Sequence, residues 1–142
     1  MPDNRAIIER FEHAFAANDT STIDELCDPG LVDHNPVPGN PPTLEGFKAA
    51  IAAYKAAFPD LAVHLGEIVA DGDTVATRWS AAGTHEGDMM GIPPTDKQIA
   101  VEGMNFYRLR GGRITDVWTQ FDGVGMLQQL GVMPAPEGAV AG

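Results

Sequence analysis

Cysteine, positive charge and long apolar runs are all scarce in this sequence. Cys27 is the only cysteine among 142 residues, which excludes an internal disulfide and a thiolate metal cluster and fits a reducing cytoplasm. No apolar run approaches the ~18 residues that span a bilayer, and the first residues are not a basic stretch leading into an apolar one. We therefore expect a cytoplasmic protein that is neither exported nor embedded in a membrane.

Basic residues are outnumbered by acidic ones. Nine Lys and Arg residues stand against twenty Asp and Glu residues, which gives a formal net charge of −11. Such a field repels phosphate backbones and anionic lipid surfaces, so we expect neither nucleic acid nor a membrane as partner. Hydrophobic residues make up 44% and charged residues 20%, as in globular proteins, and the length suits one domain over residues 1–142 with a flexible tail at 132–142.

Apolar residues recur at helical spacing in the first part of the chain. Residues 6–18 predict a helix with a stripe on one face: Ile7, Ile8, Phe11, Ala14 and Phe15. A short second helix follows through Ile23 and Leu26, and the four prolines of residues 36–42 predict a loop. Thr43 is a suitable cap for a third helix with its own stripe: Phe47, Ile51, Tyr54 and Phe58.

The apolar period changes from helical spacing to alternation after Pro59, which predicts strands. The expected strands cover residues near 63–69, with a bulge, then 75–81, 99–110 and 113–122. The last two flank Gly111-Gly112, a pair suited to the positive φ angles of a tight hairpin. Helices followed by antiparallel strands predict an α+β fold with the helices on one face of a bent sheet.

The hairpin turn predicts the register of the last two strands. Counting back from it gives three opposed pairs whose side chains share one face of the sheet: Asn105 with Trp118, Gly103 with Gln120, and Val101 with Asp122. The opposite face is then apolar: Met104, Phe106, Val117 and Phe121. Since the helices of so short a chain can cover only one face, we expect a homodimer through the outer sheet face.

Four stretches of the sequence, in order along nearly the whole chain, match the motifs of a known family. They are VDHNP at 32–36, AFPDL at 57–61, GTHEG at 83–87 with GIPPT at 91–95, and WTQFD at 118–122 with MLQQLG at 126–131. The third is the most specific. On these motifs the chain resembles the SnoaL-like polyketide cyclases of the nuclear transport factor 2-like superfamily, although that family usually has glycine where this chain has Asp96.

The resemblance implies a fold and an activity. The fold is a cone in which a curved antiparallel sheet and about three helices enclose an apolar pocket, with the dimer contact outside. The activity of characterised members is a cofactor-free intramolecular aldol condensation that closes a ring in an aromatic polyketide. The acid/base aspartate of the family falls on Asp122. We expect a small, largely apolar aromatic or polyketide-like substrate and no cofactor.

The candidate site residues follow from the predicted faces and from the resemblance. Asp122 is the candidate catalytic acid/base, and the alternative is that it caps the last helix. His34 and His85 are candidate donors to a substrate carbonyl, and the alternative for each is a structural histidine. The expected substrate contacts are Trp118, Asn105, Gln120, Trp79, Phe15, Met89 and Met90. No metal site is expected, because the histidines occur singly.

Other functions on this fold remain alternatives. The limonene epoxide hydrolases use an Arg-x-Asp sequence on one strand, which this chain lacks. Ketosteroid isomerases use a tyrosine of the first helix, where this chain has Phe11 and Phe15. A non-catalytic domain that binds a small molecule is the main alternative, because a fold by itself does not determine a function.

Overall fold

The computed structural model describes residues 3–134. Its helices are α1 (Asn4–Ala17), α2 (Thr20–Leu26), α3 (Leu44–Ala57) and α4 (Gly123–Gln129). Its strands are β1 (Cys27–Asp33), β2 (Ala62–Asp71), β3 (Thr74–Thr84), β4 (Gln98–Arg110) and β5 (Arg113–Phe121). The predicted α+β fold is confirmed, with four described helices in place of about three. Most of the tail predicted at 132–142 lies outside the described residues.

Polar side chains at the start of the helices explain where they begin. Asp3, Asp19 and Thr43 each accept a hydrogen bond from the backbone N–H three residues further on, at 3.1, 3.2 and 3.3 Å. These bonds satisfy N–H groups that have no partner within the helix. Helix α1 is followed by its C-cap Asn18, whose φ of 51° lies in the left-handed region that closes many helices.

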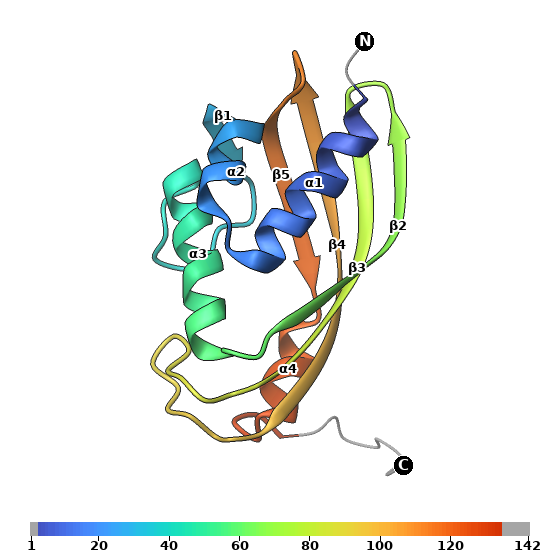
Figure 1. Ribbon diagram of the computed structural model, residues 1–142. Coiled ribbons are helices and arrows are strands. Elements are labelled where there is room, and N and C mark those ends of the chain that lie inside the picture. The colour runs from blue at the N-terminus through green and yellow to red at the C-terminus, as the bar shows by residue number, and fades with distance from the viewer. Residues whose placement is uncertain (1–2, 135–142) are drawn as a thin grey trace.

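The strands form one five-stranded sheet in the order β1-β5-β4-β3-β2. Strands β2 to β5 are antiparallel, as predicted, and β1 joins the edge parallel to β5. Figure 1 shows α1, α2 and α3 on one side of the curved sheet and α4 beyond the end of β5. The curvature and these helices make the expected cone, and no described helix covers the outer face of β4 and β5.

A β-bulge in β5 changes the predicted register of the hairpin. Beside the turn, Arg110 is opposite Arg113, as predicted. Between Leu109 and Arg108 the register shifts by one residue, and Thr115 has no partner. At this point the Thr115 hydroxyl donates to the Arg108 carbonyl at 3.2 Å.

The shift reverses the faces predicted for β5. Trp118 lies opposite Phe106 and Thr119 opposite Asn105, so the predicted pairing of Asn105 with Trp118 is wrong. The predicted pairings of Gly103 with Gln120 and of Val101 with Asp122 are also wrong, because Gly103 pairs with Phe121 and the Asp122 N–H donates to the Glu102 carbonyl. Side chains alternate along a strand, so a slip of one residue exchanges inside and outside. Thr119 and Phe121 therefore face the helices, and Trp118 and Gln120 face outward.

The two faces of β4 differ in burial. On the inner face, Tyr107 is fully buried, and its ring meets that of Phe11 from α1 edge to face, with centroids 5.6 Å apart. On the outer face, Met104 is 61% and Phe106 44% exposed.

None of the described helices is long and apolar enough to cross a bilayer.

Candidate functional site

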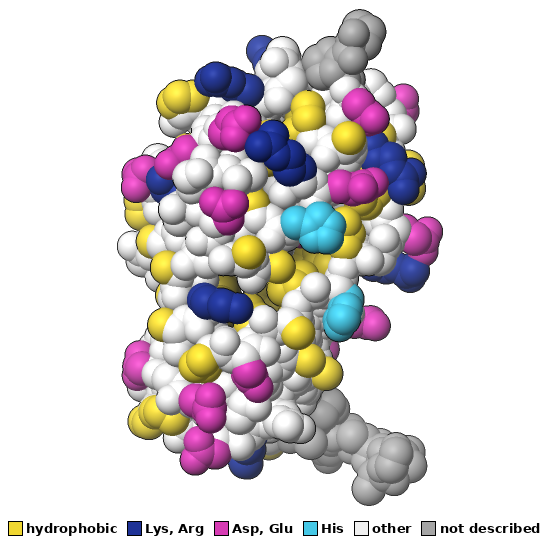
Figure 2. All heavy atoms as spheres, in the orientation of Figure 1, with side chains coloured by type: hydrophobic (Ala, Val, Ile, Leu, Met, Phe, Trp, Pro, Cys, Tyr) yellow, Lys and Arg dark blue, Asp and Glu magenta, His cyan; other side chains and the backbone are white. Residues whose placement is uncertain are grey.

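A cavity lies between the inner face of the sheet and helices α1 and α3. It measures about 130 Å³. Figure 2 shows a hollow lined by apolar side chains on the helix-covered side of the molecule. Apolar and aromatic side chains form most of its wall: Phe15, Val37, Phe47, Ala50, Ile51, Tyr54, Phe58, Leu61, Val63, Trp79, Ala81, Ile99, Val101 and Phe121. The polar lining is a small set: Glu12, Asp33, Asn35, Asn105 and Thr119.

Asp33 brings a carboxyl group to this wall from the end of β1. It lies two residues after buried Leu31, so strand alternation turns it toward the helices, and it is only 5% exposed. Its Oδ1 accepts from the Asn35 N–H at 3.0 Å, and its Oδ2 has no hydrogen bond within residues 3–134. Burial raises the pKa of the Asp33 carboxyl, and the Asn35 N–H partly offsets this. Asp33 is thus a poorly hydrated acid that faces an apolar cavity.

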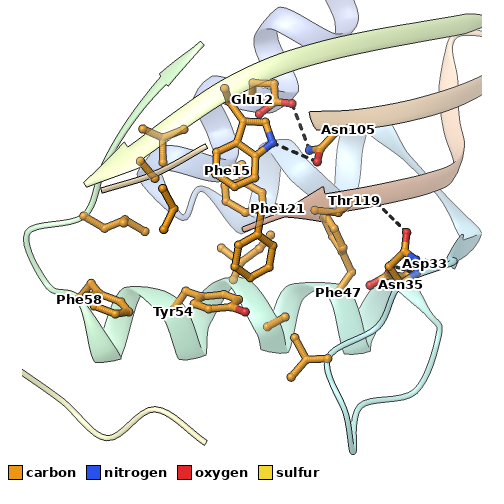
Figure 3. A pocket seen from close by; sticks show the side chains of 18 of the residues that line it. Glu12, Phe15, Asp33, Asn35, Phe47, Tyr54, Phe58, Asn105, Thr119 and Phe121 are labelled. Atoms are coloured by element: carbon orange, nitrogen blue, oxygen red, sulfur yellow. Dashed lines mark hydrogen bonds between the residues drawn. The ribbon is translucent and has the colours of Figure 1, made fainter. Parts of the chain in front are cut away.

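Asn35 and Thr119 complete this part of the wall. The Asn35 Oδ1 accepts from the Thr119 N–H at 2.9 Å, which ties the segment after β1 to β5. In Figure 3, Asn105 and Thr119 lie between the Asp33–Asn35 turn and a second acid, Glu12. The polar side chains therefore form a band across one wall, and the α3 side of the cavity is aromatic.

Glu12 reaches the cavity from α1, where it is 5% exposed. Its Oε1 accepts from the Thr77 hydroxyl at 3.2 Å and from the Tyr107 hydroxyl. The Asn105 amide donates to the Tyr107 hydroxyl at 2.7 Å and lies 3.5 Å from the same Oε1. Burial raises the pKa of the Glu12 carboxyl more than these hydrogen bonds lower it.

Asp122 does not face the cavity. It is exposed, and its Oδ1 accepts from the Gly125 N–H at 2.8 Å as the N-cap of α4. The predicted inward position of Asp122 is wrong, because the bulge in β5 moves it out of phase with the inner face. The alternative interpretation, a helix cap, is confirmed.

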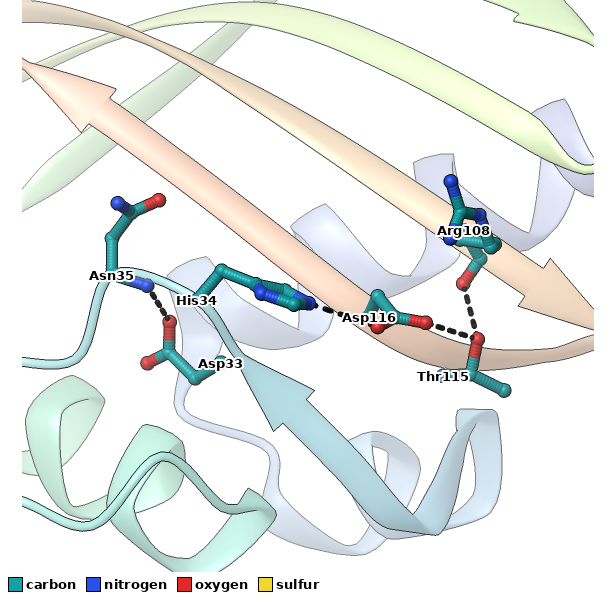
Figure 4. Close-up of polar contacts among 6 residues, drawn as sticks. All are labelled: Asp33, His34, Asn35, Arg108, Thr115 and Asp116. Atoms are coloured by element: carbon teal, nitrogen blue, oxygen red, sulfur yellow. Dashed lines mark hydrogen bonds and ion pairs between the residues drawn. The ribbon is translucent and has the colours of Figure 1, made fainter.

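His34 and Trp118 lie together on the outer face instead of in the cavity. Their rings stack with centroids 4.1 Å apart and planes 5° from parallel. The His34 Nε2 is 2.9 Å from the Asp116 Oδ2, as Figure 4 shows, and this contact lowers the pKa of the Asp116 carboxyl. The Arg108 guanidinium lies 5.5 Å from the centre of the Trp118 ring. We call these four residues the outer cluster.

The other predicted contacts divide into three groups. Phe15, Trp79 and Asn105 line the cavity. Met90 and Gln120 are exposed and line a second, more open recess that shares residues with the cavity wall. Met89 and His85 are buried outside the lining. The His85 Nδ1 lies 3.0 Å from the Thr95 hydroxyl, and its ring packs on Phe58.

Glu12 and Asp33 were not among the predicted site residues, although the sequence carries a signal for each. Glu12 directly follows Phe11 on the buried stripe of α1, an unusual place for a charge. Asp33 alternates with Leu31 in the same strand. Thr119 had no such signal, because its inward position depends on the bulge. Within residues 3–134 no three His, Cys, Asp or Glu side chains are grouped to hold a metal ion.

Comparison with known proteins identifies a family. A family model described as SnoaL-like polyketide cyclase matches residues 5–130. The chain is similar to the aklanonic acid methyl ester cyclase DnrD of Streptomyces peucetius, with 31% identity over 140 residues that cover 93% of this chain and 94% of the relative. It is also similar to the nogalonic acid methyl ester cyclase of Streptomyces nogalater, with 30% identity over 130 residues that cover 83% and 90%.

A solved structure agrees with these relatives. The crystal structure of wild-type IdmH from Streptomyces antibioticus superposes with a TM-score of 0.79 at 37% sequence identity. The match covers 91% of this chain and 99% of that one. The similarity therefore extends over the cavity walls and the strands that build them.

Proposed function

Because the chain belongs to the SnoaL-like polyketide cyclase family and has the nuclear transport factor 2-like fold, we propose that it closes a ring in a small, largely apolar polyketide-like substrate. The proposed reaction is an intramolecular aldol condensation that needs no cofactor. The observation that carries this proposal is the carboxyl group of Asp33, which is buried in the wall of a mostly apolar cavity.

Asp33 is the proposed general acid and base, the role that the sequence assigned to Asp122. A general base works best when its pKa lies near the pH at which the enzyme operates, and burial raises the pKa of Asp33 from its ordinary value in that direction. Its Oδ2 is free to meet a substrate, whereas Oδ1 is held by the Asn35 N–H. Asp122 is hydrated and occupied as a cap.

The proposed cyclisation conserves its protons. The Asp33 carboxylate removes a proton from the carbon next to a substrate carbonyl, and the electrons of that C–H bond move to the carbonyl oxygen. The enolate carbon then forms a bond to a second carbonyl carbon in the same molecule, whose oxygen becomes an alkoxide. Asp33 returns its proton to this alkoxide, which leaves a hydroxy ketone and a carboxylate ready for the next turnover.

The relatives suggest which substrates to test first. They are named for the methyl esters of aklanonic and nogalonic acid. An aromatic polyketide suits a cavity whose wall includes Phe15, Phe47, Tyr54 and Phe121. We therefore propose aromatic polyketide methyl esters as the substrate class.

The test compares two aspartates in the same assay. With aklanonic acid methyl ester, we expect Asp33→Asn to lower kcat by about 10²-fold or more, because the amide cannot exchange the proton. We expect Asp122→Asn to stay within about twofold, because asparagine is also a good helix cap. Product formation is followed by chromatography of the cyclised ester.

Three results would contradict parts of the proposal. Full activity of Asp33→Asn would remove the assigned acid/base, and a large loss in Asp122→Asn alone would return that role to Asp122. Binding of the esters without any turnover by the unmodified protein would favour the alternative of a non-catalytic binding domain.

We also propose that the protein is a homodimer through the outer face of the sheet. Met104 and Phe106 of β4 leave large apolar surfaces in water, and the Phe106 ring meets Trp118 of the outer cluster edge to face at 5.8 Å. Exposed apolar patches of this kind commonly mark a contact between proteins. A second copy related by twofold symmetry would cover both patches at once.

A further inference from the structure

Glu12 is a second buried acid in the cavity wall, and the proposed cyclisation does not use it. Its two carboxyl oxygens are in different situations. Oε1 accepts hydrogen bonds from the Thr77 and Tyr107 hydroxyls. Oε2 makes no hydrogen bond with residues 3–134, and it is not among their polar atoms that are sealed from solvent. Because Glu12 lines the cavity, Oε2 opens into it.

An indole fixes the direction of the hydrogen bonds behind Glu12. The Trp79 Nε1 can only donate, and it donates to the Asn105 Oδ1 at 3.1 Å. The Asn105 amide nitrogen is therefore the atom that donates to the Tyr107 hydroxyl, at 2.7 Å. The Tyr107 hydroxyl accepts there and directs its own proton to the Glu12 Oε1. The chain of donors thus ends on one carboxyl oxygen and leaves the other free.

The environment shifts Glu12 toward its protonated form. Burial is the largest influence on the pKa of Glu12 and raises it. Burial is also the largest influence on the pKa of Tyr107 and raises it well above its usual value, so the phenol keeps its own proton. Since Oε1 is used as an acceptor, the proton of a neutral Glu12 lies on Oε2, directed at the cavity.

We propose that Glu12 donates a hydrogen bond from Oε2 to a carbonyl oxygen of the ligand, and that this contact selects ligands with a ketone or quinone oxygen at this end of the cavity. Its part in turnover rests on the proposed cyclase function. There, electrons from the C–H bond broken by Asp33 collect on that carbonyl oxygen, and the Glu12 O–H stabilises the enolate without giving up its proton. A neutral carboxylic acid in an apolar site is a known means of stabilising such an oxygen.

A purely structural role for Glu12 predicts a different result. If the carboxyl only satisfied Thr77 and Tyr107, it would not distinguish a ligand that accepts a hydrogen bond from one that does not. Two bicyclic probes of similar shape test this: 1-tetralone, whose only polar group is a ketone oxygen, and tetralin, which has none. Calorimetry gives the ratio of their dissociation constants for each variant, and this ratio does not depend on turnover.

We expect Glu12→Leu to lower the relative preference for 1-tetralone by about three- to tenfold, the worth of one buried hydrogen bond. Glu12→Gln should stay within about twofold of the unmodified protein, because its amide oxygen can accept from Tyr107 while its NH₂ donates to the ketone. The matched control is Glu9→Gln on the same helix, whose side chain is 46% exposed and paired with Arg5. It should leave the ratio unchanged.

Infrared spectroscopy keeps the proposal testable if Glu12→Leu does not fold. The unmodified protein should show the C=O stretch of a protonated carboxyl group that Glu12→Gln lacks, and that band should shift when 1-tetralone binds. An unchanged ratio in Glu12→Leu, or the absence of that band, would overturn the proposal. Either result is compatible with turnover that depends on Asp33. A failed cyclase assay would not affect the binding results, because the ratio of dissociation constants does not depend on turnover.

Discussion

The two faces of the sheet treat acidic side chains in opposite ways. Asp33 and His34 are neighbours in the chain, yet Figure 4 shows their side chains pointing to opposite sides of β1. On the inner face, burial raises the pKa values of Asp33 and Glu12. On the outer face, the contact with His34 lowers the pKa of Asp116. Burial on the inner face thus shifts its acids toward the neutral form, and the contact on the outer face shifts Asp116 toward the charged form.

This difference follows from what each face lies against. The inner acids are enclosed by aromatic and aliphatic walls, where the charged form loses hydration. Asp116 keeps 21% of its side chain exposed and has a histidine, a threonine hydroxyl and an arginine close to it. The inner face therefore suits the proposed acid/base site, and the outer face suits the proposed dimer contact.

The largest expected effect is on stability, and it compares neighbours on opposite faces of β4. Tyr107→Ala should lower the free energy of unfolding by about 3–5 kcal/mol, because it leaves a cavity beside Phe11 and removes a partner of Glu12. Phe106→Ala should cost less than about 1 kcal/mol per chain, because its ring is already 44% exposed. Urea unfolding gives both values. Equal costs at low protein concentration would contradict the assignment of the faces.

The second effect concerns the proposed dimer. Met104→Glu places a new charge in the middle of the outer face and should weaken dimerisation by at least tenfold, or about 1.4 kcal/mol. Val124→Glu is the matched control, since Val124 is similarly exposed, at 55%, and belongs to α4, which lies beyond the end of β5 (Figure 1). Sedimentation over a range of concentrations measures both. A monomeric unmodified protein at roughly micromolar concentration would contradict the dimer.

The fold was predictable because its signals are local and repeated. The stripes of α1 and α3, the alternation of β4 and the Gly111-Gly112 turn each fixed one element, and the structure confirms them. In β4, the alternation predicted the inner position of Asn105 correctly. Elements that rest on several agreeing signals tolerate an error at any one of them.

The candidate site was less predictable because it depends on a single residue. The bulge at Thr115 has no distinct sequence signal, and it turned Trp118 and Gln120 outward and Thr119 and Phe121 inward. Asp122 then falls where a strand ends and a helix begins, so its side chain caps α4. Glu12, on the buried stripe of α1, and Asp33, which alternates with Leu31 in β1, both lay within the reach of sequence patterns.

The smallest expected effect is the dependence of stability on pH, which should have opposite signs on the two faces. Glu12 has a pKa raised from 4.5, so between that value and its folded pKa the folded chain holds a proton that the unfolded chain has released. Its contribution to stability therefore falls as pH rises above about 4.5. The groups facing it, Tyr107, Thr77 and Asn105, and the charge of His13 on its own helix, are the same in the Glu12→Gln variant.

Asp116 should behave in the reverse way. Its pKa is lowered from 3.8 by the contact with His34, so its contribution is complete above about pH 3.8 and is lost as pH falls through the folded value. Urea unfolding from about pH 3 to about pH 8 of the unmodified protein, Glu12→Gln and Asp116→Asn reports on each group and its direct contacts, because the titrations of distant groups cancel in the difference. The Glu12 difference should decline above about pH 4.5, and the Asp116 difference should decline below about pH 3.8. A flat Glu12 difference would mean an ordinary carboxylate on the inner face, and the contrast between the two faces would then be lost together with the neutral donor in the cavity.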